Sequence, residues 1–277
     1  MVTIKMIVII LLLYPFFVLY AQEKMAAVTD SHFQIIEYND PTYGGKIRHL
    51  KNPNGHEHNI YYNRNSFNAD SSLMVVVHSD LEQKNWKVFL HDGNGNPIKE
   101  LFPIEKYDWR LVWDRKNPNI LYTWKGSNLY RFDITSCKAE LLKSFSPLGL
   151  KPNGPSLNQE GNRVLIITSD NTYRSFHLPD MKEEQTFNID IPNGCSVGWD
   201  KICYIGYNNF IHIAYRSDDL TKQAIIICDD TGNVFHEFKG LGGGGHYTFS
   251  PDGKLAYFKM PVRQRGGKEP TPLEIHV

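Results

Sequence analysis

The sequence predicts an all-β fold in which one unit of antiparallel strands recurs along the chain. The evidence is a turn followed by a short apolar run, which appears around Asp70, Asn117, Glu160, Asp200 and Asp252. Successive turns are 47, 43, 40 and 52 residues apart. A period in this range, with strand-like runs on both sides of each turn, is typical of propeller blades. We therefore expect a β-propeller of four-stranded antiparallel blades, with about five recognisable blades.

The charge balance of the chain limits the classes of binding partner that we expect. The chain carries 30 Lys plus Arg against 30 Asp plus Glu, so it presents no overall field that would attract nucleic acid or an anionic membrane surface. Aromatic residues make up 13% of the chain, and it holds 21 glycines and 15 prolines, which suits many short strands and tight turns. We expect no nucleic-acid partner.

We expect the first residues of the chain to lie outside the folded domain. Lys5 is followed by an apolar run that ends at Tyr20, and a small residue, Ala21, follows. This pattern predicts a secretory signal peptide over residues 1–21, a linker over 22–32 and the propeller over 33–277. An uncleaved membrane anchor is the alternative, but the run is shorter than the ~20 apolar residues that a span needs, and Pro15 interrupts it. We expect a secreted or periplasmic protein with no stable membrane span after cleavage.

Each predicted unit has two hairpins. Strands A and B flank the recurring turn, and A lines the central axis of the ring. A second hairpin supplies strands C and D, at residues 87–101, 129–142, 173–182 and 224–238. The tips at 92–95 and 229–233 read Asp-Gly-Asn-Gly and Asp-Asp-Thr-Gly-Asn, which supply the positive φ that tight hairpins demand.

The two ends of the chain are out of phase with this pattern. Residues 33–50 read as a C–D hairpin with no A–B pair before it, and residues 245–260 read as an A–B pair. Either the first hairpin completes the last blade and closes a five-bladed ring, or the chain is part of a longer propeller. A strand-like segment at 273–277 has no place in a closed five-bladed ring. We therefore expect an incomplete ring, truncated at its C-terminal end, which leaves two sheet edges unpaired.

The four cysteines show no metal-binding spacing. Cys203 and Cys228 lie inside apolar strand runs, where a cysteine is usually a small buried hydrophobic residue. Cys195 and Cys203 could instead face each other across a hairpin, which export would permit but which we do not favour.

Residues just before each A strand should gather on one face around the axis, so they are the candidate site residues. The first such segment, residues 55–64, holds two histidines, two tyrosines and an arginine. The candidates from this and the later segments are His56, His58, Tyr62, Arg64, Tyr107, Trp109, Arg110, His246 and Tyr247. Unpartnered surface histidines, core tyrosines and packing tryptophans are the plain alternatives for these positions.

Two of these segments resemble parts of a known protein family. The stretch from Gly55 to Asp80, with its His-Glu-His-Asn-Ile-Tyr-Tyr start, resembles the opening blade of secreted propeller polysaccharide lyases of the oligogalacturonate lyase and ulvan lyase types. The segment from His246 to Gly253 also resembles blade starts in that group. The resemblance implies cleavage of uronic-acid polymers by β-elimination, with histidine and tyrosine as base and acid, and in some members a divalent metal. No late histidine cluster matches such a metal site, so the cofactor stays unknown and no residue is assigned as a metal ligand.

The chemistry of β-elimination assigns a role to each candidate. The carboxylate beside the abstracted proton must be neutralised, and the reaction needs a base of near-neutral pKa and an acid for the leaving oxygen. We expect His58 as the base, Tyr62 as the proton donor, and Arg64 or Arg110 as the carboxylate clamp, with His246 across the axis. The expected substrate contacts are His56, Arg64, Tyr107, Trp109 and Tyr247.

The leading hypothesis is therefore an exported propeller that recognises an acidic polysaccharide and, if it is an enzyme, cleaves it as a lyase. The alternative is a non-catalytic propeller that acts as a binding or scaffold module for a polysaccharide or another extracellular ligand. A hydrolase ranks third, because it needs two facing carboxylates and the upstream segments offer only Glu57 and Asp108.

Overall fold

The computed structural model describes residues 33–60, 65–104, 111–149, 156–168, 172–178, 180–205, 210–219, 221–240, 246–249 and 256–259. The predicted signal peptide and linker lie outside these residues. Within them no helix is long and apolar enough to cross a membrane.

The strands form four four-stranded antiparallel sheets, each built from consecutive strands. The first is β3 (Gly55–His58), β4 (Leu73–Asp80), β5 (Trp86–Asp92) and β6 (Pro97–Ile104). The second is β7 (Leu111–Trp113), β8 (Ile120–Lys125), β9 (Asn128–Asp133) and β10 (Lys138–Ser144), followed by the short 3-10 helix η1 (Ser146–Leu148). The third is β11 (Ser156–Leu157), β12 (Arg163–Ile167), β13 (Tyr173–His177) and β14 (Glu183–Phe187). The fourth is β15 (Cys195–Tyr204), β16 (Ile211–Ser217), β17 (Gln223–Cys228) and β18 (Val234–Lys239).

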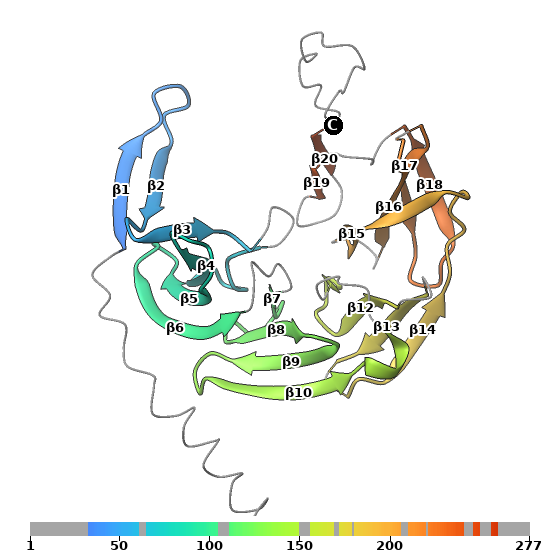
Figure 1. Cartoon of the computed structure of the whole chain (residues 1–277), viewed down its shortest axis with the longest axis horizontal. Coiled ribbons are helices and arrows are strands. Elements are labelled where there is room, and N and C mark those ends of the chain that lie inside the picture. Colours follow the sequence, from blue (N-terminus) through green and yellow to red (C-terminus); the bar gives the residue numbers. More distant parts are fainter. Residues whose placement is uncertain are drawn as a thin grey trace, which may run out of the picture.

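Two further hairpins stand at the ends of this series. They are β1 (Gln34–Asn39) with β2 (Lys46–Lys51), and β19 (His246–Phe249) with β20 (Ala256–Lys259). Figure 1 shows the sheets following one another in an arc, with β1–β2 at one end and β19–β20 at the other. The predicted all-β propeller architecture with four-stranded antiparallel blades is confirmed.

Apolar side chains fill the space between consecutive sheets. One buried cluster joins the first and second sheets, and similar clusters join the second to the third and the third to the fourth. Burial differs between the inner and outer edges of the second sheet: every residue of the inner strand β7 is buried, whereas the outer strand β10 is mainly exposed. Burial of each large apolar side chain contributes about 1.5–3 kcal/mol, so these three interfaces hold the sheets in order.

The recurring turns connect the first two strands of each sheet, as predicted, at Asp70, Asn117 and Glu160. Neighbouring turns touch: the Asn68 side chain donates a hydrogen bond to the Pro118 carbonyl at 3.1 Å. Contact between turns places them on one face of the arc. Asp252 lies outside the described residues.

The predicted turn at Asp200 is wrong. Asp200 lies inside β15, where the register with β16 shifts between Val197 and Ile202, and the true connection begins at Ile205 and ends at Phe210. An irregularity within the strand therefore looks like a turn in the sequence, because it places polar residues between two strand-like runs.

The structure confirms the two end hairpins but does not pair them with each other. β1–β2 and β19–β20 form separate two-stranded sheets, so the described strands do not close the ring. The first hairpin is held against the first sheet instead: Phe33 makes edge contacts with the rings of His78, Phe89 and His91. The predicted strand at 273–277 lies outside the described residues.

All four cysteines are described, and none is joined in a disulfide. Cys228 is fully buried, as predicted. Cys195 and Cys203 lie on the same strand, β15, so they do not face each other across a hairpin. The prediction of a buried Cys203 is wrong, because its side chain is only partly buried.

Candidate functional site

A cavity of about 200 Å³ lies where the innermost strands of the four sheets end. It is lined by the first turn, by the residues after β7, and by residues of β11 and β15: Asn65, Phe67, Asn68, Ala69, Ser71, Val112, Trp113, Asp114, Arg115, Ser156, Leu157, Cys203 and Tyr204. The cavity lies at the end of the A strands that leads into the A–B turns, whereas the sequence predicted a site among the residues just before each A strand. The volume is below the ~300–1,000 Å³ of most ligand pockets, so it suits one small polar group or a single ring.

Asx-type hydrogen bonds build the turns around this cavity. The side-chain oxygen of Asn68 accepts a hydrogen bond from the Leu73 amide at 3.0 Å, and that of Asn158 accepts one from the Arg163 amide at 3.0 Å. Asparagine and aspartate favour turns because their short side chains bond to backbone amides a few residues on. These bonds fix the turn backbones that carry the lining residues.

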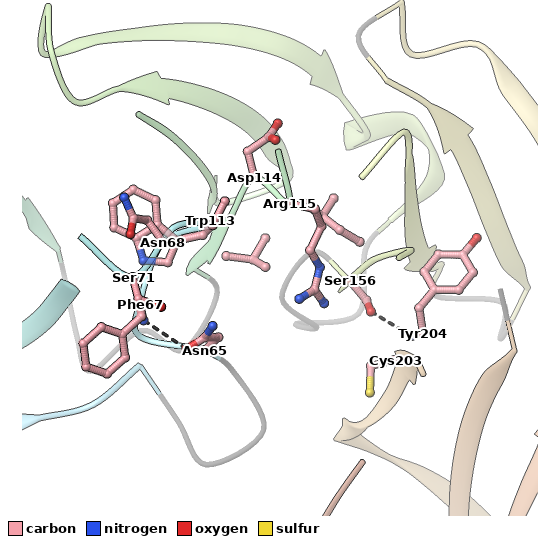
Figure 2. Close-up of a pocket in the computed structure, with 13 residues that line it drawn as sticks. Asn65, Phe67, Asn68, Ser71, Trp113, Asp114, Arg115, Ser156, Cys203 and Tyr204 are labelled. Carbon is pink, nitrogen blue, oxygen red and sulfur yellow. Dashed lines mark hydrogen bonds between the residues drawn. The ribbon is translucent and has the colours of Figure 1, made fainter. Parts of the chain in front are cut away.

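Arg115 is the main cation of the cavity. Figure 2 shows its side chain reaching into the pocket, between Asn65 on one side and Ser156 and Cys203 on the other. Surrounding protein atoms partly strip water from the guanidinium, and this desolvation lowers the pKa of Arg115. Arginine still stays protonated at neutral pH. No carboxylate among the described residues pairs with it, and the side chain is exposed to the cavity.

The neighbouring carboxylate, Asp114, is held by other groups. Its Oδ1 accepts hydrogen bonds from the amides of Lys116 and Asn117, each at 2.8 Å, and its Oδ2 accepts one from the Tyr122 hydroxyl at 2.9 Å. Burial, reinforced by the Asp114 charge, raises the pKa of Tyr122, so this phenol remains a donor at neutral pH. Asp114 therefore stabilises its own turn and leaves the Arg115 charge to the cavity.

A thiol and an imidazole meet at the edge of the cavity. Cys203 on β15 and His212 on β16 are directly paired across the two strands, and Cys203 Sγ lies 3.0 Å from His212 Nδ1. His212 is 1% exposed, whereas Cys203 lines the cavity. Sequence reasoning missed this pair and Arg115. Arg115 stands in the segment Trp113-Asp-Arg-Lys, which leads from the end of β7 into the second recurring turn, and this position is the sequence feature that could have identified it.

The structure places His56 and His58 on strand β3, and neither is among the residues that line the cavity. Their rings lie 6.4 Å apart, and the His58 ring packs 5.3 Å from that of Trp86. Burial first, and then the neighbouring His56, lowers the pKa of His58, so its ring is neutral at neutral pH. The neutral ring is the form that accepts a proton.

The remaining predicted site residues stay predictions. Tyr62, Arg64, Tyr107, Trp109 and Arg110 lie outside the described residues. His246 and Tyr247 belong to β19, of which the structure describes the backbone.

The residues that the structure describes contain no group of three or more His, Cys, Asp or Glu side chains able to hold a metal ion. His56 and His58 alone offer two ligands on one strand, which does not make the closed or nearly closed ligand set of a protein metal site.

Comparison with solved structures agrees with this architecture. The chain is similar to an oligogalacturonate lyase from Vibrio parahaemolyticus at 11% identity, with a TM-score of 0.51 over 84% of this chain and 78% of that one. A structure described as oligogalacturonate lyase in complex with manganese matches at 12% identity and a TM-score of 0.51, with the same coverage. The C-terminal WD40 domain of Sif2 matches at 12% identity and a TM-score of 0.50, over 79% of this chain and 58% of that one.

No family model and no curated protein sequence matches this chain. At 11–12% identity the structural likeness establishes the fold. The resemblance to oligogalacturonate lyases that the sequence indicated is confirmed at that level.

Proposed function

We propose that this protein is an exported propeller that binds an acidic, uronate-containing polysaccharide and cleaves it by β-elimination. The observation that carries the proposal is Arg115, a guanidinium in a cavity at the ends of the innermost strands, with no carboxylate partner among the described residues. A cation that is partly desolvated and not paired within the protein is stabilised by an incoming anion.

A sugar carboxylate fits this position. Arginine binds carboxylates through two parallel N–H···O bonds, which fix the plane of the acid as well as its charge. Asn65 and Ser71, which are exposed at the cavity, supply groups that can bond to sugar hydroxyls, and Phe67 supplies an apolar ring. The small volume accommodates one uronate residue rather than a long stretch of chain.

The lytic half of the proposal rests on the residues predicted from the sequence. His58 is the base, and its lowered pKa supports that role because it keeps the ring neutral. Tyr62 remains the predicted proton donor and Arg110 the predicted clamp. Likeness to oligogalacturonate lyases supports the substrate class, and the predicted signal peptide supports export.

Calorimetric titration with oligogalacturonate tests the binding half. Arg115→Gln should weaken binding about 10- to 100-fold, which corresponds to the ~1.5–3 kcal/mol of a charged hydrogen bond. The matched control is Arg131→Gln, because Arg131 lies on β9 and pairs with Glu140 at 3.7 Å, outside the cavity. Equal affinity in Arg115→Gln and wild type, or equal affinity for a neutral glucan, would refute the proposal.

Ultraviolet absorbance tests the lytic half, because β-elimination leaves an unsaturated sugar. Wild type should raise the absorbance of polygalacturonate, ulvan or alginate, and His58→Ala should abolish the rise while binding is retained. Binding without an absorbance rise would establish the alternative, a binding module. His56 and His58 do not line the cavity, so this measurement decides between a lyase and a binding module.

A further inference from the structure

The pair of Cys203 and His212 has the geometry of an activated thiol. A contact of 3.0 Å between Sγ and Nδ1 allows the thiol to donate its hydrogen to the imidazole when Nε2 carries the ring hydrogen. Proton transfer along this contact gives a thiolate beside an imidazolium, the arrangement that lowers thiol pKa values in reactive cysteines. His212 is 1% exposed, so the packing around β16 fixes the imidazole beside Cys203.

The surroundings of Cys203 also favour an anion. Arg115 lines the same cavity and is close enough that a charged Cys203 would raise the pKa of Arg115. By linkage, the guanidinium favours the thiolate by the same interaction. After proton transfer the imidazolium of His212 and the guanidinium of Arg115, which come from two different sheets, would both stabilise the thiolate.

The contrast with Cys228 shows what access to the cavity adds. Cys228 is fully buried, and burial raises the pKa of its thiol to about 12. It is therefore inert at neutral pH. Cys203, 25 residues earlier on the innermost strand of the same sheet, combines access from the cavity with cationic neighbours. A reactive cysteine needs both features.

We propose that Cys203 is a nucleophilic thiol and that the cavity around it is a site of thiol–disulfide exchange with small disulfides that carry carboxylates. The thiol proton passes to His212. The thiolate then attacks one sulfur of the disulfide, and a bond forms between Cys203 Sγ and that sulfur. The disulfide bond of the reagent breaks, and its electron pair leaves with the departing thiolate. Arg115 holds a carboxylate of the reagent during the attack, and a reduced thiol reverses the modification by the same route.

This inference does not depend on the polysaccharide. It uses the charge of Arg115 and the thiol–imidazole contact, which are present whether or not the cavity accepts a sugar. Loss of sugar binding with intact thiol reactivity would refute the proposed function alone, and the reverse result would refute this inference alone.

Reaction with two reagents of different charge tests it on the full chain. Dithiobis(nitrobenzoate) carries two carboxylates, whereas dithiodipyridine is neutral, and both release a coloured thiol. Peptide mass spectrometry after brief exposure should show Cys203 modified first, about 10-fold faster than Cys137 or Cys195, which are also partly buried. Cys203→Ser should remove the fast phase with both reagents.

Two variants separate the roles of the neighbours. Arg115→Gln should slow the anionic reagent about 10-fold and the neutral one by less than about 3-fold, because the guanidinium attracts and holds the carboxylate. His212→Gln should slow both reagents at Cys203 and leave Cys137, which contacts Lys99 at 3.1 Å, unchanged. If Cys203 reacts no faster than the other partly buried thiols, or if Arg115→Gln slows both reagents equally, the proposal is wrong. Arg115 is exposed, so this variant keeps the test valid even if His212→Gln fails to fold.

Discussion

The two ends of the innermost strands differ in how their polar side chains are used. At the upstream end, β3 carries three ionisable residues in a row, and two of them are engaged by the protein: Glu57 Oε1 pairs with His78 Nδ1 at 2.9 Å, and His58 packs against Trp86. At the downstream end, Arg115 has no carboxylate partner among the described residues. We therefore expect a cation with no carboxylate partner among the described residues to mark a binding site better than a dense run of reactive residue types does.

The largest expected effect tests how the downstream end is held together. Trp113 is 3% exposed, belongs to the cluster between the first two sheets, and donates a hydrogen bond from Nε1 to the Ser66 carbonyl at 2.8 Å. Trp113→Ala should lower the free energy of unfolding by about 3–5 kcal/mol, because it leaves a large hole and an unpaired carbonyl. Urea unfolding measures the loss.

Trp86→Ala is the matched change at the upstream end, where Trp86 is 8% exposed and donates to the Gln83 carbonyl at 2.8 Å. It should cost a similar free energy but leave oligogalacturonate affinity unchanged below the unfolding transition. A wild-type midpoint for Trp113→Ala, or an equal loss of affinity in both variants, would contradict the division between the two ends.

A smaller expected effect tests whether the third turn, which contains Gly161, positions Arg115. Gly161 has φ +68°, and an added Cβ would lie 2.8 Å from Cβ of Arg115. Gly161→Ala should cost about 1 kcal/mol of stability and also displace Arg115, which lowers both sugar affinity and the rate of the anionic disulfide at Cys203.

Gly126→Ala is the control for this change, because Gly126 has φ +59° and nothing within 4 Å of an added Cβ. It should cost a similar amount of stability and leave the cavity unaffected. If the two variants behave alike in binding and thiol reactivity, the third turn does not position Arg115.

The smallest expected effect lies at the upstream end and concerns pH. Burial lowers the pKa of His58 below the ~6.5 of an unfolded chain. The unfolded state therefore binds the proton more readily, so the contribution of His58 to stability is present above pH ~6.5 and is lost as the pH falls through the pKa of the folded state. NMR titration should show the His58 ring changing below pH ~6.5.

His58→Gln provides the companion measurement. Removing the ring should make the free energy of unfolding fall less steeply between pH ~6.5 and the folded pKa. A ring that titrates at or above pH ~6.5 would mean that β3 leaves His58 open to water. The polar side chains at the two ends of the innermost strands would then differ less in how far the protein engages them.

Most of the architecture could be predicted from the sequence, because turn chemistry and apolar runs are local signals. Asn68, Asn158 and the Asp-Gly-Asn-Gly tip each encode a turn through their own side chains, and the structure has turns at these positions. Asp200 misled the prediction for the same reason, since a polar residue in a strand irregularity has the composition of a turn.

The cavity could not be predicted in the same way, because its residues meet through packing between sheets. Arg115 looks like an ordinary solvated turn residue until the contacts of Asp114 show that its neighbour does not neutralise it. The pairing of Cys203 with His212 depends on the register of β15 and β16, which the irregularity near Asp200 sets. A strand register of this kind is fixed by the whole sheet and leaves no motif in the sequence.

The apolar clusters between consecutive sheets also determine how the molecule comes apart. Among the described residues, the apolar clusters join each sheet to its neighbours in the arc, so they hold the second and third sheets from both sides and the first and fourth from one side. In such a linear series, stability is a sum of nearest-neighbour couplings, and fraying starts at the ends. Cys203 and His212 belong to the fourth sheet, so any transient opening of that sheet dismantles the thiol–imidazole pair first, while the second sheet that carries Arg115 stays folded.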